Sequence, residues 1–570
     1  MSLREAESLC KCPSASAELR AVLHGGIRHA ENNASIFVVE SRDEDLGHPR
    51  PDLLCRKAAN AYHLTSEEGF RSVQVCDLGT RAAHIAPSEV NPELIGWLSG
   101  LRERLCTHDG TNTNVEPIEI FHGGVFHFRN LHPMKALVIG GGWAGIAAAM
   151  EAARLGWEVE LVEERPYLGG RARSFVDKTT GDTIDNGQHV MMGCYHELLR
   201  IVHDLGTDHL LERQKALRVA FVDESIGQDV LDASALPGKL GMLWGLLRLR
   251  NLSLSARMAI VRLALKVLRA PSAGTGLTCH EFFDQLRQPA EAVQRFWEPL
   301  VLATLNAPVS VAPAELLSTV LRLAFFGTTD DAKLLIPTGG LSDLVAPFDR
   351  WLAARGGTVR TSSSVDRITI VGGRAVGVVL SDGSNIDVDV VISTVPQRAL
   401  ARLVQASGIA SDLPEEPEMS PIVSVYLWYD HQWMSVDFAA ALGTTVQWVF
   451  NKQRTTNGLV ALTVSAASEI VGAPSEEIIR SCDAELRQLF AGTMAPAILK
   501  HGVVIKEKRA TPRFSPAAHG CRPTTDALHT HVRNLFLAGD WTQTQLPATL
   551  EGAARSGVAA IAAAEVVARS

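Results

Sequence analysis

A short apolar run, Ala136 to Ile139, stands directly before a glycine-rich turn. A run of this length without polar residues is typical of a strand buried in a parallel sheet. The alanine-rich pattern that follows predicts a helix over 146–155, and the run at 158–162 predicts the next strand. The pattern therefore predicts a β-α-β unit.

Further elements are predicted in separate parts of the chain. After a helix over 344–354, strands are expected over 358–361, 375–380 and 388–392. Strands over 424–429 and 446–450 alternate with helical pieces, and a last alanine-rich helix follows residue 546. The pattern as a whole predicts an α/β fold.

Residues 236–270 are both apolar and basic. Their cations are Lys239, Arg248, Arg250, Arg257, Arg262, Lys266 and Arg269, and no Asp or Glu occurs between Asp232 and Glu281. This reverses the sign of a chain whose formal net charge is −9. Apolar and cationic residues at helical spacing suit a helix in the interface of an anionic membrane. The alternative is a pair of core helices with a solvated basic face.

Composition narrows the class of protein. The 570 residues are 46% hydrophobic and 21% charged, as in ordinary globular proteins, and the negative net charge argues against nucleic-acid binding. We find no uncharged apolar run of 18 residues and no secretory signal in Met1 to Cys12. We therefore expect a cytoplasmic protein, peripheral on the inner face of a membrane.

Residues 1–133 show weak apolar periodicity, although they hold five of the nine cysteines. Cys10-Lys-Cys12 has no second pair at the spacing of a structural zinc site, so we expect no metal. Met134 stands immediately before the first strand of the β-α-β unit. We expect the functional protein to start near Met134, with 1–133 a dispensable extension of unknown role or a misplaced start.

The glycine-rich turn after the first strand is the first candidate for a binding site. Gly140, Gly142 and Gly145 follow G-x-G-x-x-G spacing, which allows a tight turn, close approach to a pyrophosphate and close helix packing. The N-terminus of the helix offers free N–H groups to phosphates. Glu163, at the end of the second strand, is suitably spaced to bind ribose hydroxyls. These residues predict a dinucleotide site.

Two further segments identify the dinucleotide. Leu168-Gly-Gly-Arg-Ala-Arg173 and Leu535-Phe-Leu-Ala-Gly-Asp540 resemble the FAD-binding elements of the flavin-containing amine oxidase and phytoene desaturase superfamily. The resemblance implies that FAD is the cofactor, with Arg171 by the pyrophosphate, Asp540 by the phosphate and ribityl chain, and Val365 against the adenine. It also assigns cofactor contacts to Trp143, Ala144, Glu164, Gly170, Gly539 and Thr549.

The resemblance also implies a domain organisation. A discontinuous Rossmann-like FAD-binding domain is expected from residues 134–200, 336–400 and 506–570. A mixed α+β substrate domain is expected from 201–335, with apolar membrane-facing helices, and from 401–505.

Other segments resemble one group within the superfamily, the squalene-associated FAD-dependent desaturases of bacterial hopanoid biosynthesis. They are Asp185-Asn-Gly-Gln-His189, Trp297-Glu-Pro-Leu300, Gln447-Trp-Val-Phe450 and Gly539-Asp-Trp-Thr542. This resemblance implies reductive removal of an allylic hydroxyl from hydroxysqualene, giving squalene. The sequence shows no second nucleotide fingerprint, so we expect the electrons to come from a separate reductase or free reduced flavin. One departure is Gln545, where we expect glycine.

The leaving hydroxyl needs an acid. The candidates are Asp185 and His189, on a hairpin-like segment expected to deliver them towards the flavin, with Tyr195 behind them. The alternative is that this segment is only a structural turn touching the flavin.

Three other functions remain open. A carotenoid (phytoene-type) desaturase would use the same cofactor in the oxidative direction. An amine oxidase would need an aromatic cage, which an aromatic content of 6% disfavours. A non-catalytic flavoprotein would bind FAD without turnover.

Overall fold

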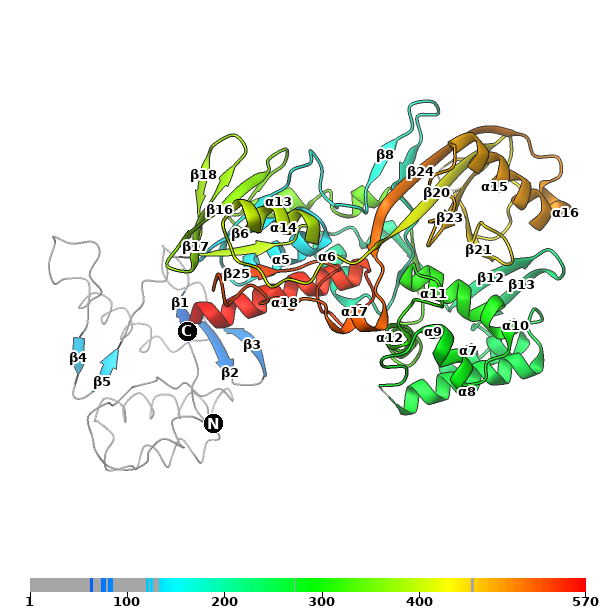
Figure 1. Cartoon of the computed structure of the whole chain (residues 1–570), viewed down its shortest axis with the longest axis horizontal. Coiled ribbons are helices and arrows are strands. Elements are labelled where there is room, and N and C mark those ends of the chain that lie inside the picture. Colours follow the sequence, from blue (N-terminus) through cyan, green and yellow to red (C-terminus); the bar gives the residue numbers. More distant parts are fainter. Residues whose placement is uncertain are drawn as a thin grey trace. The chain divides into compact units, whose positions relative to one another are not determined.

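The computed structural model of the chain (Figure 1) describes residues 133–270, 272–452 and 456–569. Before residue 133 it describes five strands: β1 (Tyr62–Leu64), β2 (Val73–Asp77), β3 (Thr80–Ile85), β4 (Glu119–Phe121) and β5 (Gly124–Phe126). The chain divides into two compact units, Met1–His132 and Pro133–Ser570. The predictions for Cys10 and Cys12, and for the role of 1–133, concern residues outside the described part.

A five-stranded parallel sheet forms the base of the second unit. Its order is β15 (Thr358–Arg360), β7 (Glu158–Val162), β6 (Lys135–Ile139), β19 (Val390–Ser393) and β25 (Leu535–Leu537). Each neighbouring pair is parallel. Helix α5 (Trp143–Arg154) connects β6 to β7. Because the strands come from three separated parts of the chain, the predicted discontinuous Rossmann-like fold is confirmed.

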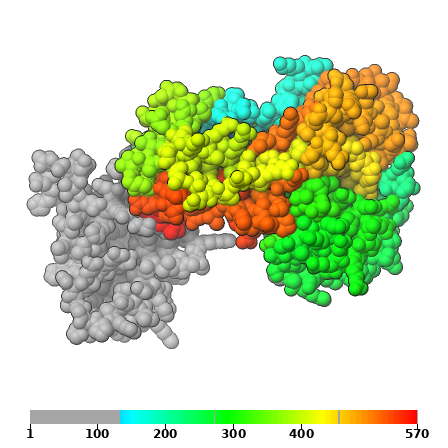
Figure 2. Space-filling view, in the orientation of Figure 1, coloured from blue at the N-terminus to red at the C-terminus, as the bar shows by residue number. Residues whose placement is uncertain are grey.

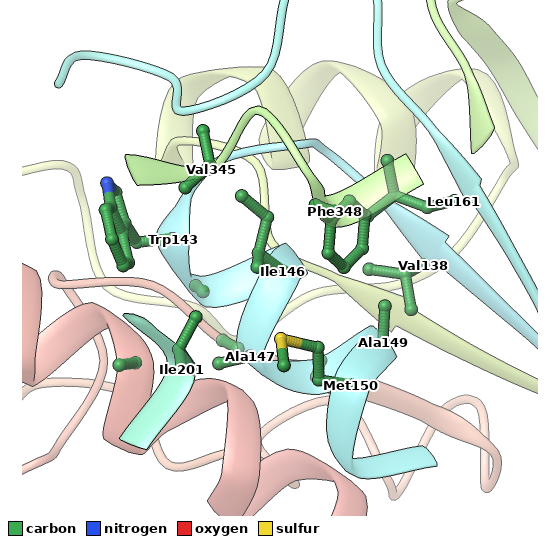
Figure 3. Close-up of a cluster of buried hydrophobic side chains, with 14 of the residues drawn as sticks. Val138, Trp143, Ile146, Ala147, Ala149, Met150, Leu161, Ile201, Val345 and Phe348 are labelled. Carbon is green, nitrogen blue, oxygen red and sulfur yellow. The ribbon is translucent and has the colours of Figure 1, made fainter. Parts of the chain in front are cut away.

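Small side chains allow α5 to be buried on all sides. Ala147, Ala148 and Ala149 have no exposed surface. The last helix, α18 (Leu550–Arg569), approaches so closely that a Cβ on Gly557 would lie 2.2 Å from the Ala144 carbonyl oxygen. Figure 3 shows larger α5 side chains, such as Ile146, packed among residues of the sheet and of neighbouring helices. The alanine-rich pattern thus reflects close helix packing.

A second, seven-stranded mixed sheet forms the substrate-domain side. Its order is β13 (Gly227–Asp232), β12 (Arg218–Asp223), β21 (Phe438–Ala441), β22 (Trp448–Asn451), β23 (Leu459–Val464), β20 (Met419–Tyr429) and β24 (Leu499–Pro512). Only β12 and β21 pair in parallel among these seven strands. Strand β24 extends past the boundary expected at residue 505 and reaches Pro512.

Helices from the middle of the chain gather beside this sheet, in green in Figures 1 and 2. They are α7 (Lys239–Arg248), α8 (Leu254–Arg269), α9 (Cys279–Gln285), α10 (Ala290–Ala292), the π-helix η3 (Val293–Trp297), α11 (Glu298–Leu305) and α12 (Ala314–Phe325). The basic segment 236–270 therefore forms two helices. The break between them ends at Ser253, whose hydroxyl accepts a bond from the Ala256 N–H and so caps α8.

The remaining elements join these layers. Along the chain they are β8 (Ser174–Val176), β9 (Thr183–Asp185), β10 (Met191–Met192), α6 (His196–Asp204), η2 (Asp208–Leu210), β11 (Leu211–Arg213), β14 (Leu334–Pro337), η4 (Leu341–Leu344), α13 (Phe348–Ala353), β16 (Val365–Val371), β17 (Arg374–Leu380), β18 (Asn385–Asp387), α14 (Gln397–Ala406), α15 (Ser475–Leu489), α16 (Ala491–Met494) and α17 (Pro516–Gly520). The single helix expected over 344–354 is replaced by η4 and α13. Pro347 stands at the N-cap of α13, where its fixed φ and missing N–H start a new helix.

Candidate active site

A cavity of about 1230 Å³ runs between the parallel sheet and the substrate domain. One end is lined by the glycine turn and its neighbours, including Gly140, Gly142 and Asp540. The other end is lined by apolar residues of the helices α7, α8, η3, α11 and α12 and of the mixed sheet. We call these parts the nucleotide end and the apolar chamber. One continuous space therefore joins two different chemical environments.

The three glycines of the turn have different surroundings. Gly140 has a φ of +107°, which disfavours a side chain there. A Cβ on Gly145 would lie 1.9 Å from the Gly140 carbonyl oxygen, so Gly145 serves helix packing and does not line the cavity. A Cβ on Gly142, in contrast, would meet no atom within 4 Å. Gly142 thus leaves open space beside the start of α5.

The start of α5 suits an anionic group. No side chain caps this helix, and its first residues, Trp143 and Ala144, line the cavity. The free N–H groups of a first turn carry partial positive charge. Among the described residues, the buried indole N–H of Trp143 also has no hydrogen-bond partner. Together with the space at Gly142, these donors fit the pyrophosphate of a dinucleotide.

Glu163 lies beside the same turn. Its carboxylate accepts bonds from the Gly141 N–H at 2.6 Å and the Arg165 N–H at 2.8 Å. It lines the cavity together with Val365. Glu164 also reaches the cavity wall, although its carboxylate is paired with the exposed Arg165 at 3.1 Å.

The two segments of the superfamily resemblance meet at this end. Arg171 donates to the Asp540 carboxylate at 2.7 Å and to the Ala510 carbonyl oxygen at 2.5 Å. The charge of Asp540, chiefly, raises the pKa of Arg171. Gly170 and Thr549 line the cavity beside this pair, and Gly539 precedes Asp540 in the wall. The contact brings together residues 369 positions apart.

Asp185 occupies an anchoring position rather than the cavity-facing one that we expected. Its carboxylate is buried, 4% exposed, and is absent from the cavity wall. It accepts bonds from the Ser174 hydroxyl at 2.7 Å and the Leu341 N–H at 3.0 Å. The Lys452 ammonium lies 3.8 Å away. Asp185 therefore holds the start of the 185–189 loop in place.

His189, the second candidate, does line the cavity. Its Nδ1 lies 3.0 Å from the Gly187 carbonyl oxygen, which can only accept, so Nδ1 carries the proton of the neutral ring. Burial lowers the pKa of His189. A second contact holds the loop in place, because the Gln188 side chain donates to the Tyr426 hydroxyl at 2.6 Å. His189 therefore presents a neutral ring, which is a poor proton donor at neutral pH.

The apolar chamber is wide and contains few polar groups. Its wall includes Leu217, Phe221, Leu246, Ile260, Phe296, Trp297, Leu300, Leu321, Phe325, Phe438, Trp448 and Phe450. Phe296 and Trp297 lie on the π-helix η3, a rare helix type that occurs often at functional sites. A wall of this composition suits a hydrocarbon ligand.

The chamber reaches the molecular surface between α7 and α8. Leu240, Leu243, Leu265 and Leu268 line it and are also exposed, by 62%, 40%, 40% and 50% of their surface. Exposed leucines that also line a cavity mark a mouth. Among the described residues, no helix combines the length and apolar character needed to cross a bilayer.

Several residues of the site were not predicted from sequence. Glu507 lines the cavity and accepts a bond from the Asn186 side chain at 3.3 Å. Tyr426, on β20, and Lys452, the residue after β22, support the 185–189 loop. No local motif marks these residues, because they are distant from the loop in sequence and reach it only through the fold. Gln545, where glycine was expected, has a φ of +59°, and its exposed side chain does not line the cavity.

Comparison with known proteins agrees with this geometry. The family model for flavin containing amine oxidoreductase matches residues 143–567. Hydroxysqualene dehydroxylase of Rhodopseudomonas palustris is 30% identical over 430 residues, covering 74% of this chain and 96% of the relative. The 15-cis-phytoene desaturase of Arabidopsis thaliana is 24% identical, covering 75% and 79%.

Solved structures share the fold. An oxidoreductase from Methanosarcina mazei aligns with a TM-score of 0.58 at 20% identity, covering 75% of this chain and 99% of its own. Putrescine oxidase bound to putrescine aligns with a TM-score of 0.56 at 16% identity, covering 77% and 99%. At these identities the likeness concerns the fold alone.

Proposed function

This chain belongs to the flavin containing amine oxidoreductase family, and from that premise we propose that it reductively removes the allylic hydroxyl of hydroxysqualene, giving squalene. It is an FAD-dependent oxidoreductase. The observation that carries the proposal is the continuity of the nucleotide end with the apolar chamber. At about 1230 Å³ the cavity exceeds the range of roughly 300–1,000 Å³ typical of pockets for a single ligand. Its two ends suit FAD and a long hydrocarbon.

The residues of the nucleotide end fit FAD. We assign the pyrophosphate to the space at Gly142 and the free N–H groups of α5, with Arg171 and Asp540 beside it. Glu163 is assigned to the ribose and Val365 to the adenine. Bound in reduced form, the cofactor supplies the hydride that the reaction requires.

The protein supplies orientation and water exclusion. The chamber binds the isoprenoid chain through apolar contacts and places its hydroxyl towards the 185–189 loop. A dry wall protects an allylic cation from capture by water, and the leaving hydroxyl still requires a proton from the protein. Asp185 anchors the start of this loop, and the neutral His189 ring lies in the cavity wall.

A membrane source suits a substrate this apolar. The mouth of the chamber carries exposed leucines, Trp244 is 41% exposed next to it, and the segment 236–270 has cations and no acidic residue. We assign this face to an anionic lipid surface, which attracts the cations and accommodates the leucines. Electrons then come from a separate reductase or from reduced free flavin.

Vesicle binding tests the membrane contact. The double substitution Leu240→Asp and Trp244→Asp should weaken co-sedimentation with vesicles of anionic phospholipid at least about tenfold, because each change removes buried apolar area and adds a repelled charge. Ile498→Asp, at a residue 54% exposed elsewhere on the unit, is the matched control. Equal binding of both variants would contradict the assignment.

The reaction itself is tested by reducing the bound flavin anaerobically and adding hydroxysqualene. We expect the flavin to reoxidise as squalene forms. The phytoene desaturases among the relatives define the second candidate, a desaturase that works in the oxidative direction. Bleaching of the oxidised flavin by phytoene, with no squalene formed from hydroxysqualene, would establish that alternative.

A further inference from the structure

We propose that Glu507 is the acid that protonates the leaving hydroxyl, an assignment that rests on the proposed function. Glu507 lies on β24 and lines the cavity with Ala510 and Thr511 of the same strand. Its carboxylate oxygens accept the Asn186 side-chain N–H and the Arg509 backbone N–H, both at 3.3 Å. Its partner in the ladder is Ile422, which also lines the cavity. The carboxylate thus lies between the 185–189 loop and the apolar sheet.

The strand is irregular at this point. Ser420 pairs with Thr511 and Ile422 with Glu507, so a step of two residues along β20 is matched by a step of four along β24. Such bulges are common next to active sites, where they redirect side chains. In regular pairing, alternate residues would face opposite sides of the sheet. Here the irregularity allows Glu507, Ala510 and Thr511 all to reach the cavity.

The other carboxylates of the cavity wall are committed elsewhere. Among the described residues that line it, these are Glu163, Glu164 and Asp540. Glu163 accepts two backbone N–H groups beside the glycine turn, Glu164 pairs with Arg165, and Asp540 pairs with Arg171. All three lie at the nucleotide end.

Three other proton donors of the wall, His189, Tyr195 and Lys239, are less suitable. His189 is held neutral with its proton bonded to the Gly187 carbonyl oxygen. Burial raises the pKa of Tyr195, which makes its hydroxyl a poor acid. The Lys239 ammonium donates to the Phe326 carbonyl oxygen at 2.9 Å, near the mouth of the chamber. Glu507 is the group best placed beside the loop.

The proposed step balances in atoms and electrons. The allylic C–O bond breaks, its electron pair stays on oxygen, and the proton of the Glu507 carboxyl completes a water molecule. The allylic carbon receives a hydride, whose source is reduced flavin, and becomes a C–H carbon. A hydrocarbon filling the chamber displaces water from around the carboxyl.

Glu507→Gln tests the proposal. It keeps the shape and the bond to Asn186 but removes the acid, so reoxidation of the reduced flavin by hydroxysqualene should slow about 100-fold or more. Flavin affinity, measured by titration of the apoprotein, should stay unchanged. Glu507→Asp should restore part of the rate. Glu418→Gln, at a carboxylate paired with Arg513 on the exposed surface, is the matched control and should behave as wild type.

Glu507 also contributes to raising the pKa of Arg171, so a merely structural role as its second counter-charge is the alternative. Weakened flavin binding in Glu507→Gln would establish that role and overturn the proposal. Unchanged turnover in Glu507→Gln, with active wild type, would overturn it as well. Wild-type protein that leaves hydroxysqualene unreacted would instead overturn the proposed function, and the acid with it.

Discussion

The two ends of the cavity are built by different physical rules. At the nucleotide end, the position of single atoms determines whether the fold and the binding site can form. A Cβ on Gly145 has no room, whereas a Cβ on Gly142 would enter the space assigned to the cofactor. Charged groups there have specific partners, as Arg171 has in Asp540. In the apolar chamber the wall consists mainly of large apolar side chains from helices and a sheet. Trp297 also makes a polar contact, because its indole N–H donates to the Gln288 side chain. The nucleotide end therefore depends on the exact position of individual groups, whereas the apolar chamber depends on the overall shape and volume of its wall.

This difference decides how each end responds to substitution. The nucleotide end should lose its function when a single atom is added in the wrong place. A chamber specified by shape should tolerate apolar exchanges of similar volume and respond to changes of volume.

The largest effect is expected from adding one methyl group at Gly145. Gly145→Ala places a Cβ 1.9 Å from a backbone oxygen that cannot move freely, and should lower the free energy of unfolding by about 3 kcal/mol or more. Gly142→Ala should leave unfolding of the apoprotein unchanged, because a Cβ there meets no atom within 4 Å. It should weaken flavin binding at least about tenfold, which corresponds to roughly 1.4 kcal/mol of binding free energy. Denaturant unfolding and flavin titration check both; equal effects would contradict the distinction.

A volume change should affect the chamber alone. Ala264 lies on α8 and lines the chamber, so Ala264→Phe fills part of the space for the hydrocarbon. Turnover of hydroxysqualene should fall at least about tenfold while flavin affinity stays constant. Single-turnover kinetics and flavin titration separate the two. Loss of flavin would mean that the ends are not independent.

Lowering the pH should reduce the free energy of unfolding through the buried His519. His519 on α17 is 5% exposed, and burial, with the nearby Arg522 charge, lowers its pKa to about 4. Unfolded, it titrates near about 6.5. Between these values the unfolded chain binds one more proton, so stability falls as pH falls, by at most about 1.4 kcal/mol per pH unit. His519→Gln should reduce this slope in urea unfolding between pH 6.5 and 4; an unchanged slope would exclude His519 as its source.

The smallest effect concerns the departure at Gln545. Its φ of +59° is a conformation that glycine adopts without strain. Gln545→Gly should therefore stabilise the protein by about 0.5–1 kcal/mol, reduced by the greater entropy of an unfolded glycine. Flavin affinity should not change, because the side chain does not line the cavity. Thermal unfolding of the holoprotein checks the direction.

The nucleotide end was largely predictable from sequence because its requirements are local. The spacing of Gly140, Gly142 and Gly145 follows from one turn, and the predicted strand Ala136–Ile139 lies within β6. The parallel sheet followed from short apolar runs, and its discontinuity from the resemblance. The separate positions of η4 and α13 were missed because the apolar pattern continues through Pro347.

The chamber and its acid were not predictable in the same way. Phe296 and Leu300 face a cavity, but the same residues would serve equally well in a solid core. Glu507 gains its position from an irregular pairing between β20 and β24, which no periodicity reveals. Asp185 stood in a distinctive motif, yet its carboxylate turns to Ser174 and Leu341. Position in a motif indicated importance without indicating the side to which the group points.

The order of the parallel sheet has a consequence for biosynthesis. Strand β6 pairs with β19, and β19 pairs with β25, which ends only 33 residues before the C-terminus of the 570-residue chain. From the emergence of β6 to that of β25 the ribosome needs about 20–80 s at roughly 5–20 residues per second. Until then one edge of β19 lacks its partner, although β6, β7, β15 and β19 can already pair with one another. The nascent chain is therefore a natural client for chaperones, and a truncation before β25 should leave an aggregating fragment rather than a smaller flavoprotein.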